Sequence, residues 1–438
     1  MSRAAPLMGA LYGDAGMAAL LSEPAALAAM LRVESALARA QAAVGDIPAA
    51  AADAIAATAG TLTPAPADLA ARAATAGIAA QPLIGALKAA VAAEHGAETA
   101  GFVHYGATSQ DITDSALALQ LAEALALLHG RLVSLDATLA ARAEAYAGQP
   151  IPARTRHQIA APTTLGAKIA VWRGIQSRNL TRLGELRPRL LLLSLHGAAG
   201  TSAALGPHAD RVRAAMAAEL GLTAPPGPWH AARDGMAELA GWLALVTGGL
   251  GKMGLDLVQL GQSEIAEVTA GAGGGSSTMP QKSNPVAAEA LVALARLNAG
   301  DVAGMQHAMI HAQERDGTVL GLEWAILPAM LERTAASLRL AQELADTLAP
   351  APDRIAATFA ADRGRMTAEA AGFLLARRMP RAQALVTVAE ALRLVAADDA
   401  PTLADALSRL APGTDWHGAL DPATLPHNDK TQREETPT

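Results

Sequence analysis

The sequence predicts an all-α fold built around a central bundle of five long helices. Of its 438 residues, 51% are hydrophobic but only 3% are aromatic, so alanine and leucine carry most of the apolar content. Both are strong helix formers, and the β-branched runs that favour strands are scarce. Over five long stretches the apolar residues recur every three or four positions, which is the spacing of one helix face.

Residues 1–110 are expected to form an N-terminal domain of short helices that glycine and proline separate. Residues 24–43 carry leucine, methionine and valine at helical spacing. Further helices are predicted over 49–59 and 82–94, with a proline-containing linker at 61–69 between them.

The central domain, residues 111–348, is expected to hold the five long helices. Their connections are short, which makes neighbouring helices antiparallel, as in helix bundles. Pro328 is expected to kink the fifth helix, and the interval 202–235 is expected to be irregular because a Pro/Gly run interrupts it. The five helices are predicted at 113–146, 164–195, 234–268, 285–313 and 322–348.

A third domain is predicted over residues 349–425, after a boundary at Ala349-Pro350-Ala351-Pro352. Residues 426–438 form a polar tail that is expected to be disordered. The shorter helices of this domain are predicted at 353–360, 367–378, 381–397 and 402–410.

Charge and composition exclude several classes of protein. The net charge is -7 without a basic stripe, so nucleic acid is not an expected partner. The absence of cysteine excludes disulfides and thiolate chemistry. No signal-peptide pattern and no charge-free apolar stretch of membrane length is present, so a cytoplasmic protein without membrane contact is expected. No metal-ligand, Rossmann or P-loop motif stands out, so neither a metal nor a cofactor is expected.

Residues 271–289 combine a mobile loop with a rigid helix start. Four of the first five residues are glycine, Ser276 and Ser277 follow, and Asn284-Pro285 has the residue types of an N-cap and a first helical position. Such a loop can close over a bound anion and present Lys282 to it. The alternative is a flexible surface loop, which most Gly/Ser runs are.

Two further polar segments are candidates for substrate binding. His104 to Asp111 precedes the first long helix, whose N-terminal N–H groups can bind a carboxylate. The alternative is that Thr108 or Ser109 only caps that helix. Arg154 to Gln158 is dense in hydrogen-bond donors.

These three segments carry a resemblance to a known family. Gly275 to Pro285, with the sequence GSSTMPQKSNP, resembles the signature loop of the fumarase/aspartase superfamily. Gly106 to Asp111 and Arg154 to Gly166 resemble the first and second regions of that superfamily, in the same order. The resemblance covers nearly the whole chain. It implies a homotetramer with a twenty-helix core, in which each active site combines the three regions from three different subunits.

Within the superfamily, several local features resemble the cycloisomerase branch. That branch implies closure of 3-carboxy-cis,cis-muconate to a γ-lactone through an aci-carboxylate intermediate, in the β-ketoadipate pathway of aromatic catabolism. The features are Gly197 to Thr201, Pro228 to His230, Arg233-Asp234, Gln313 to Arg315 and Glu323-Trp324.

The resemblance also implies roles for individual residues, with a small polycarboxylate as substrate. It assigns proton transfer to Ser276 and places Ser277, Lys282 and Asn284 beside it, while Glu289 is a charge partner. Two assignments have alternatives: His104 could be a structural residue at the helix entry, and Arg315 could lie in a solvated turn. The predicted substrate-binding residues are His104, Thr108, Ser109, Gln110, Arg154, Thr155, Arg156, Gln158 and Arg315.

The sequence departs from the superfamily pattern at three positions. Arg156 stands where the lyases usually have histidine, and His157 comes one place late. An arginine cannot exchange protons near neutral pH, so Arg156 is expected to pair with Glu289 or with a substrate carboxylate. Gln281 and Ser283 also replace a common histidine and a common basic residue.

Two other functions remain open from the sequence. One is a lyase of the adenylosuccinate type that releases fumarate, against which Arg156 argues. The other is a catalytically silent structural homologue, against which the intact Ser276, Lys282 and Asn284 argue.

Overall fold

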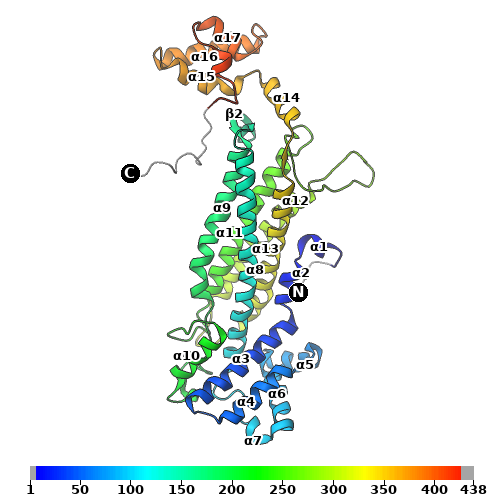
Figure 1. Ribbon diagram of the computed structural model, residues 1–438, viewed down its shortest axis with the longest axis vertical. Coiled ribbons are helices and arrows are strands. Elements are labelled where there is room, and N and C mark those ends of the chain that lie inside the picture. Colours follow the sequence, from blue (N-terminus) through cyan, green and yellow to red (C-terminus); the bar gives the residue numbers. More distant parts are fainter. Residues whose placement is uncertain (1–5, 426–438) are drawn as a thin grey trace. The chain divides into compact units, whose positions relative to one another are not determined.

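The computed structural model describes residues 6–425, and Figure 1 labels its helices and strands. The described chain is mostly helical, which confirms the all-α prediction, and the predicted tail at 426–438 lies outside the described residues. The chain forms two compact units. Unit 1 comprises Met1–Val133, Arg178–Gly248 and Ala293–Arg339, and unit 2 comprises Ser134–Ser177, Gly249–Val292 and Leu340–Thr438.

Five long helices are present where the apolar spacing predicts them, and each contributes residues to both units. They are α8 (Ser109–Ala145), α9 (Leu165–Leu190), α11 (Asp234–Leu260), α12 (Val286–Ala308) and α13 (Gly317–Thr347). The largest difference is at the end of α11, which was expected to reach residue 268. The chain turns at Gly261 instead, and the N–H of Glu267 folds back to donate to the carbonyl of Leu260 (3.0 Å).

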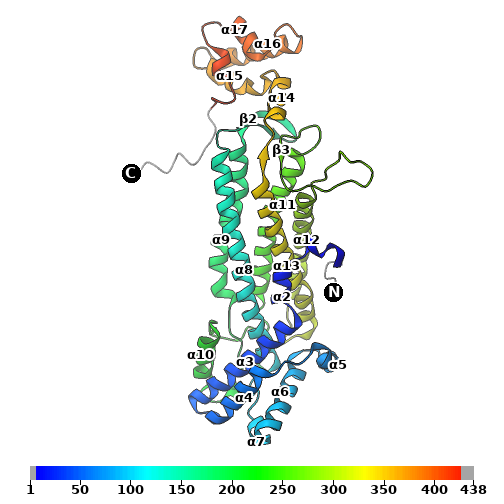
Figure 2. The ribbon, with the colours of Figure 1, turned by 45° about the vertical axis from the view of Figure 1, so that its right-hand side comes forward.

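The N-terminal helices of unit 1 share one hydrophobic core, to which buried residues such as Leu37, Ile55 and Leu87 contribute. Helices α3 and α4 lie side by side in both Figure 1 and Figure 2. Ser22 caps α3 by accepting the N–H of Ala25. The elements are η1 (Pro6–Met8), α1 (Gly9–Tyr12), α2 (Ala15–Leu20), α3 (Glu23–Val44), α4 (Ala49–Thr61), α5 (Pro66–Ala76), α6 (Ala80–His95), α7 (Ala97–Ala100), η2 (Ala203–Leu205) and α10 (Ala209–Leu220).

Helix α10 corrects the prediction that residues 202–235 are irregular. Its side chains Val212, Met216 and Leu220 are buried and lie four residues apart, which is a helical period. The prolines and the glycine between 225 and 228 led to the prediction of an irregular segment, and the short apolar face before them was not taken into account. Helix α5 was likewise expected to be a linker, but Pro66 occupies the start of the helix, where proline is tolerated.

In each unit, buried polar contacts connect neighbouring long helices. In unit 1 the amide of Asn298 on α12 donates to the Thr334 hydroxyl on α13 (3.0 Å). In unit 2 the indole N–H of Trp172 on α9 donates to Asp256 on α11 (2.7 Å). Because these N–H donors are satisfied across the helix pair, they help to define the register in which the helices pack.

Unit 2 contains the only strands in the described part of the chain, and the sequence did not predict them. Strands β1 (Pro150–Thr155) and β2 (Gln158–Thr164) form an antiparallel hairpin, and β3 (Val268–Thr269) pairs with β4 (Ala349–Pro350). The four predicted C-terminal helices are present as α14 (Pro352–Asp362), α15 (Ala368–Leu375), α16 (Arg381–Ala396) and α17 (Leu403–Leu410). The structure adds η3 (Arg365–Thr367) and α18 (Trp416–Ala419), and α15 to α18 share a core with Trp416, which is 2% exposed.

Helices α8 and α11 are long and apolar enough to cross a membrane when only length and composition are considered. About half of each apolar window is buried inside the structure, at 44% and 56%. Core helices of soluble proteins have the same properties, so this finding is weak evidence for a membrane span.

Candidate active site

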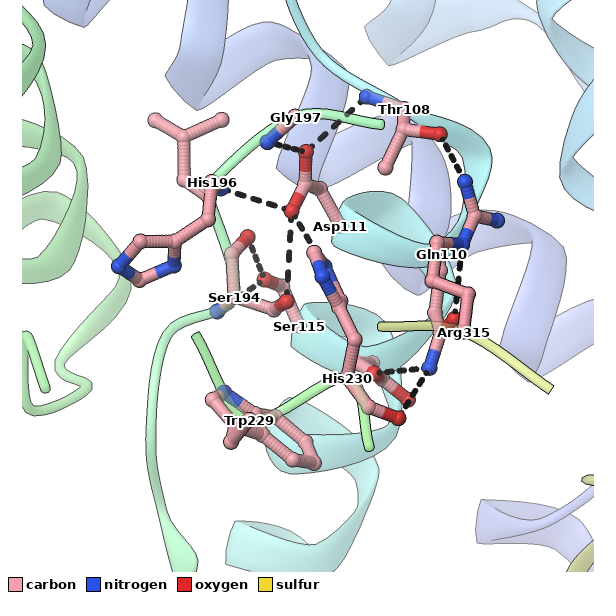
Figure 3. A network of polar contacts seen from close by, with 12 residues as sticks. Thr108, Gln110, Asp111, Ser115, Ser194, His196, Gly197, Trp229, His230 and Arg315 are labelled. Carbon is pink, nitrogen blue, oxygen red and sulfur yellow. Dashed lines mark hydrogen bonds and ion pairs between the residues drawn. The ribbon is translucent and has the colours of Figure 1, made fainter. Parts of the chain in front are cut away.

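The first predicted region is organised by the side chain of Asp111, which is 0% exposed in the first turn of α8. Its Oδ2 accepts the backbone N–H groups of Thr108 (3.0 Å) and Gly197 (2.9 Å). Its Oδ1 accepts the N–H of His196 (2.9 Å) and faces Nε2 of His230 (2.8 Å) (Figure 3). Burial favours the neutral acid, but the His230 ring and these backbone donors hold the pKa of Asp111 below its usual range.

A buried ion cluster lies one turn further along α8. Arg233 contacts Asp114 (Nη1 to Oδ2, 3.0 Å) and Glu323 (Nε to Oε2, 3.0 Å), and all three side chains are at most 5% exposed. The Arg233 guanidinium also lies over the ring of Trp229, 4.7 Å from its centroid. Burial raises the pKa of Asp114 to about 6, against the opposing effect of Arg233, and the charge of Glu323 adds to the rise.

Gln110 connects this cluster with Arg315. The Gln110 amide donates to Asp114 Oδ2 (3.1 Å) and to the carbonyl of His230 (2.9 Å). Its Oε1 accepts from Nε of Arg315 (3.1 Å), and Nη1 of Arg315 donates to the hydroxyl of Thr108 (2.7 Å) (Figure 3). Thr108, Gln110 and Arg315 were all predicted as site residues, and the fold brings them into direct contact.

His104 and Ser109 complete the first region. His104 has a left-handed backbone (φ 61°), and its Nδ1 faces Oε1 of the buried Glu34 (2.7 Å). The Glu34 carboxylate fixes the orientation of the imidazole and makes Nδ1 the protonated nitrogen when the ring is neutral. Ser109 is the first residue of α8.

The second predicted region forms the β1–β2 hairpin. Nη1 and Nη2 of Arg154 donate to the two oxygens of Glu267 (2.7 and 2.6 Å), which is 0% exposed. Arg156 and His157 form the two-residue turn at the tip, both with positive φ (50° and 66°). Turns of this kind normally use asparagine and glycine, so these two side chains occupy strained positions. Thr155, Arg156, His157 and Gln158 are all exposed.

The third predicted region is a loop closed by backbone bonds between Gly274 and Asn284 (2.8 and 2.7 Å). Ser276 is half-buried, and its hydroxyl accepts the N–H groups of Thr278 (3.4 Å) and Met279 (3.2 Å). The other predicted residues of this region, Ser277, Lys282 and Glu289, are exposed. Neither Lys282 nor Glu289 forms an ion pair with any residue between 6 and 425.

The predicted site residues therefore form three groups, each with its own local contacts. The predicted site residues did not include the buried residues that support these groups, although Asp111, His230, Arg233 and Glu323 belong to segments that carry the resemblance. The signal for part of this set was present, because two acids three residues apart at a helix start share one face. The missed residues are Asp111, Asp114, His196, His230, Arg233, Glu267 and Glu323.

Within residues 6–425, no group of three or more His, Asp or Glu side chains is arranged to hold a metal ion. The predicted site residues include the cations Arg154, Arg156, Lys282 and Arg315, which suit an anionic ligand.

Comparisons with known proteins identify the relatives of this chain. A family model described as lyase matches residues 16–304. The chain is 46% identical to a 3-carboxy-cis,cis-muconate cycloisomerase of Pseudomonas aeruginosa over 319 residues, which cover 72% of this chain and 69% of that protein. The fold matches the crystal structure of the 3-carboxy-cis,cis-muconate lactonizing enzyme from Pseudomonas putida, with a TM-score of 0.89, 37% identity, and coverage of 96% and 95%. It also matches a β-carboxy-cis,cis-muconate cycloisomerase from Acinetobacter calcoaceticus, with a TM-score of 0.90, 30% identity, and 96% coverage of both chains.

Proposed function

The chain belongs to the lyase family, and we propose that it is a cycloisomerase that closes 3-carboxy-cis,cis-muconate to a γ-carboxymuconolactone. The observation that carries the proposal is the 46% identity to a Pseudomonas aeruginosa enzyme of that name. Such an enzyme would act in the protocatechuate branch of the β-ketoadipate pathway, by which aromatic compounds are degraded.

The proposed reaction needs few catalytic groups. The attacking carboxylate is already ionised, so it requires no base. Its oxygen forms a C–O bond to one carbon of a double bond, and the π electrons move into the carboxylate conjugated with the other carbon. The resulting aci-carboxylate then takes up one proton at its α-carbon. Apart from this proton, all atoms of the lactone come from the substrate, so the site needs one acid and several donors for the dianion.

We assign the proton transfer to Ser276. Its Oγ accepts two backbone N–H groups of the same loop, from Thr278 and Met279. Donors of this kind stabilise the alkoxide that remains after serine has given up its proton. Lys282 and Asn284, which follow in the loop, would supply a positive charge and a further donor when the loop closes over the substrate.

The start of α8 is the proposed binding site for one substrate carboxylate. Thr108 and Ser109 lie at the helix N-terminus, where backbone N–H groups and the helix dipole favour an anion. Arg315 contributes a full positive charge beside Thr108. The roles of His104, Thr155, Arg156 and Gln158 stay predictions. Arg154 stays a predicted ligand as well, although Glu267 already matches its charge.

We propose a homotetramer with shared active sites, in the cytoplasm. The support for this proposal is the resemblance of the three regions to those of the fumarase/aspartase superfamily, which implies that three different subunits supply the three regions of each active site. The polar groups expected at Glu289 and Arg156 would pair across such an interface.

An assay with two substrates tests the proposal. Purified protein is offered 3-carboxy-cis,cis-muconate and, separately, adenylosuccinate, while loss of the diene absorbance or release of fumarate is followed. Diene loss without fumarate release is expected, because Arg156 cannot act as the proton carrier that the fumarate-releasing lyases use. Absence of diene loss would reject the proposal, and absence of both reactions would favour a silent homologue.

The role of Ser276 is tested by replacing this residue. Ser276→Ala is expected to lower kcat by at least about a hundredfold, because the only assigned acid is removed. The exposed Ser263→Ala is a matched control that should keep wild-type activity. If Ser276→Ala keeps its activity as well, proton transfer has to be assigned to another group.

A further inference from the structure

Gln110 links Arg315 to the buried interior of unit 1. Its side chain is only 1% exposed, yet both ends of its amide are in use. Oε1 accepts from Nε of Arg315 (3.1 Å). Nε2 donates to Asp114 Oδ2 (3.1 Å) and to the carbonyl of His230 (2.9 Å). Figure 3 labels Gln110 together with Arg315 and His230.

These partners allow only one orientation of the Gln110 amide. A flipped amide would place Oε1 against a carboxylate and a carbonyl, and would turn the NH2 group toward the guanidinium. Asp114 is itself held by Arg233, whose other side pairs with Glu323. The buried ion cluster therefore fixes the orientation of the Gln110 amide, in which Oε1 faces Arg315.

Arg315 has a charge that its surroundings do not neutralise. Among residues 6–425, no carboxylate lies within ion-pair distance of it, and only two of its N–H groups have hydrogen-bond partners. It also lies beside Thr108 at the N-terminus of α8, where the helix dipole disfavours a cation. The Arg315 guanidinium is held in position by two hydrogen bonds and keeps several unpaired N–H groups, so it can bind a carboxylate.

We propose that Gln110 is a positioning residue that acts through Arg315. It holds the guanidinium so that its unused N–H groups and the first turn of α8 bind one carboxylate of the substrate together. Gln110 does not touch the substrate, because its amide is buried and fully bonded. This inference rests on the proposed function, since the ligand is one carboxylate of the same tricarboxylate substrate.

Gln110→Met tests the inference, because it keeps the side-chain length and removes both polar groups. The KM for 3-carboxy-cis,cis-muconate is expected to rise about tenfold, with a smaller change in kcat, since Arg315 is left intact but free to move. Arg315→Met should raise KM at least as much. In the double variant Gln110→Met/Arg315→Met, KM should equal that of Arg315→Met alone, because coupled residues are not additive.

Asn298→Leu is the matched control for the loss of a buried amide. Asn298 is 0% exposed and donates two hydrogen bonds within unit 1, as Gln110 does, but it contacts no predicted site residue. Its variant should lower the Tm and leave KM unchanged. The inference is overturned if Gln110→Met leaves KM unchanged, or if it raises KM by the same factor with and without Arg315.

A second readout separates this inference from the proposed function. Binding of tricarballylate, a saturated tricarboxylate, is measured by calorimetry for the wild type, Gln110→Met, Arg315→Met and the double variant. If the wild type binds this probe but does not convert 3-carboxy-cis,cis-muconate, the proposed function fails, and the affinities still decide the role of Gln110. Weaker binding in Gln110→Met that disappears in the Arg315→Met background supports the inference, and equal binding in all variants overturns it.

Discussion

The carboxylate of Asp111 connects three segments that are far apart in the sequence. It accepts hydrogen bonds from Thr108, His196, Gly197 and His230, which places the turn before α8 against the chain near residues 196 and 230. Four of its donors are N–H groups, and the Ser194 hydroxyl is a longer fifth contact to Oδ1 (3.4 Å). Each of these donors depends on an acceptor at this position. Removing the charge would leave several buried donors unpaired, which costs more than the hydrogen bonds contribute.

Asp111→Asn is expected to destabilise the protein by about 2–4 kcal/mol. The substituted amide has the same shape, but its NH2 group has to face backbone N–H donors in either orientation. Urea unfolding followed by circular dichroism measures the change. Asp405→Asn is the control and should cost about 1 kcal/mol, because the Asp405 carboxylate accepts from Thr402 in the capping box of α17 and contacts only the exposed His417 besides. A loss at Asp111 no larger than that of the control would contradict the assigned role.

His196 predicts a pH dependence of stability. It is 3% exposed, and neither ring nitrogen has a partner among the described residues. Burial, together with the charge of Arg213, lowers its pKa to about 4, while Asp111 and Asp210 oppose the shift and the neighbouring His230 adds to it. As the pH falls from 6.5 to 4, the unfolded chain takes up a proton here and the folded chain does not. The free energy of unfolding therefore decreases over this interval.

His196→Leu should remove this dependence, because it replaces an unpaired polar ring by an apolar group of similar size. The Tm of the variant minus that of the wild type is expected to grow as the pH is lowered from 7 to 4.5, measured by calorimetry in steps. Asp114, whose pKa of about 6 makes stability fall as the pH rises through the same interval, is present in both proteins and cancels in the difference. A constant difference would show that His196 does not titrate in this way.

At the scale of elements, the β1–β2 hairpin is the feature that the sequence pattern did not predict. Its strands contain Pro150, Pro152 and Pro162, which argue against strands, and its turn is Arg156-His157 rather than a glycine turn. The pair between Arg154 and the buried Glu267 anchors the hairpin beside the end of α11. Because Glu267 lies more than a hundred residues away, no local pattern at residues 150–164 indicates this anchor.

The hairpin leads into α9, and Gly166 in the first turn of α9 lies close to the backbone at the end of α8. A Cβ at this position would meet the carbonyl of Ala143 and would lie 2.8 Å from Cα of Ala147. Gly166→Ala is therefore expected to cost about 2 kcal/mol or more, because backbone would have to move. Gly184→Ala is the matched control on the same helix, with nothing within 4 Å. It should stabilise by about 0.5–1 kcal/mol through helix propensity. Equal effects of the two variants, measured by thermal unfolding, would contradict the close approach.

At the scale of the whole molecule, the proposed tetramer makes a prediction about mixed subunits. The chain has a mass of 44.4 kDa, so light scattering is expected to give about four times that mass for a closed tetramer. Ser276→Ala is expected to be nearly inactive because it lacks the assigned acid, and Arg315→Met is expected to have low activity when the substrate concentration is well below its raised KM, which is the condition used for this assay. When they are unfolded together and refolded, about a quarter of the sites should combine an intact loop with an intact first region from other subunits.

The control for this experiment is to refold each variant alone, which should not recover activity. If the mixture is no more active than the two variants by themselves, the loop and the first region belong to the same subunit.

The division of the chain into domains at residues 110 and 348 stays a prediction.

The sequence by itself determined the helical class, the five long helices and the family. Helix formation and apolar spacing are local properties, and the loop from Gly275 to Pro285 is long enough to be specific. It also indicated Thr108, Gln110 and Arg315 as site residues, although it did not indicate how they are related. Only the tertiary structure decided which of them touch, that Gln110 is buried behind Arg315, and that Arg154 pairs with Glu267. The physical reason is that buried charges and amides are satisfied by partners that lie far away in the chain, and only folding brings those partners into contact.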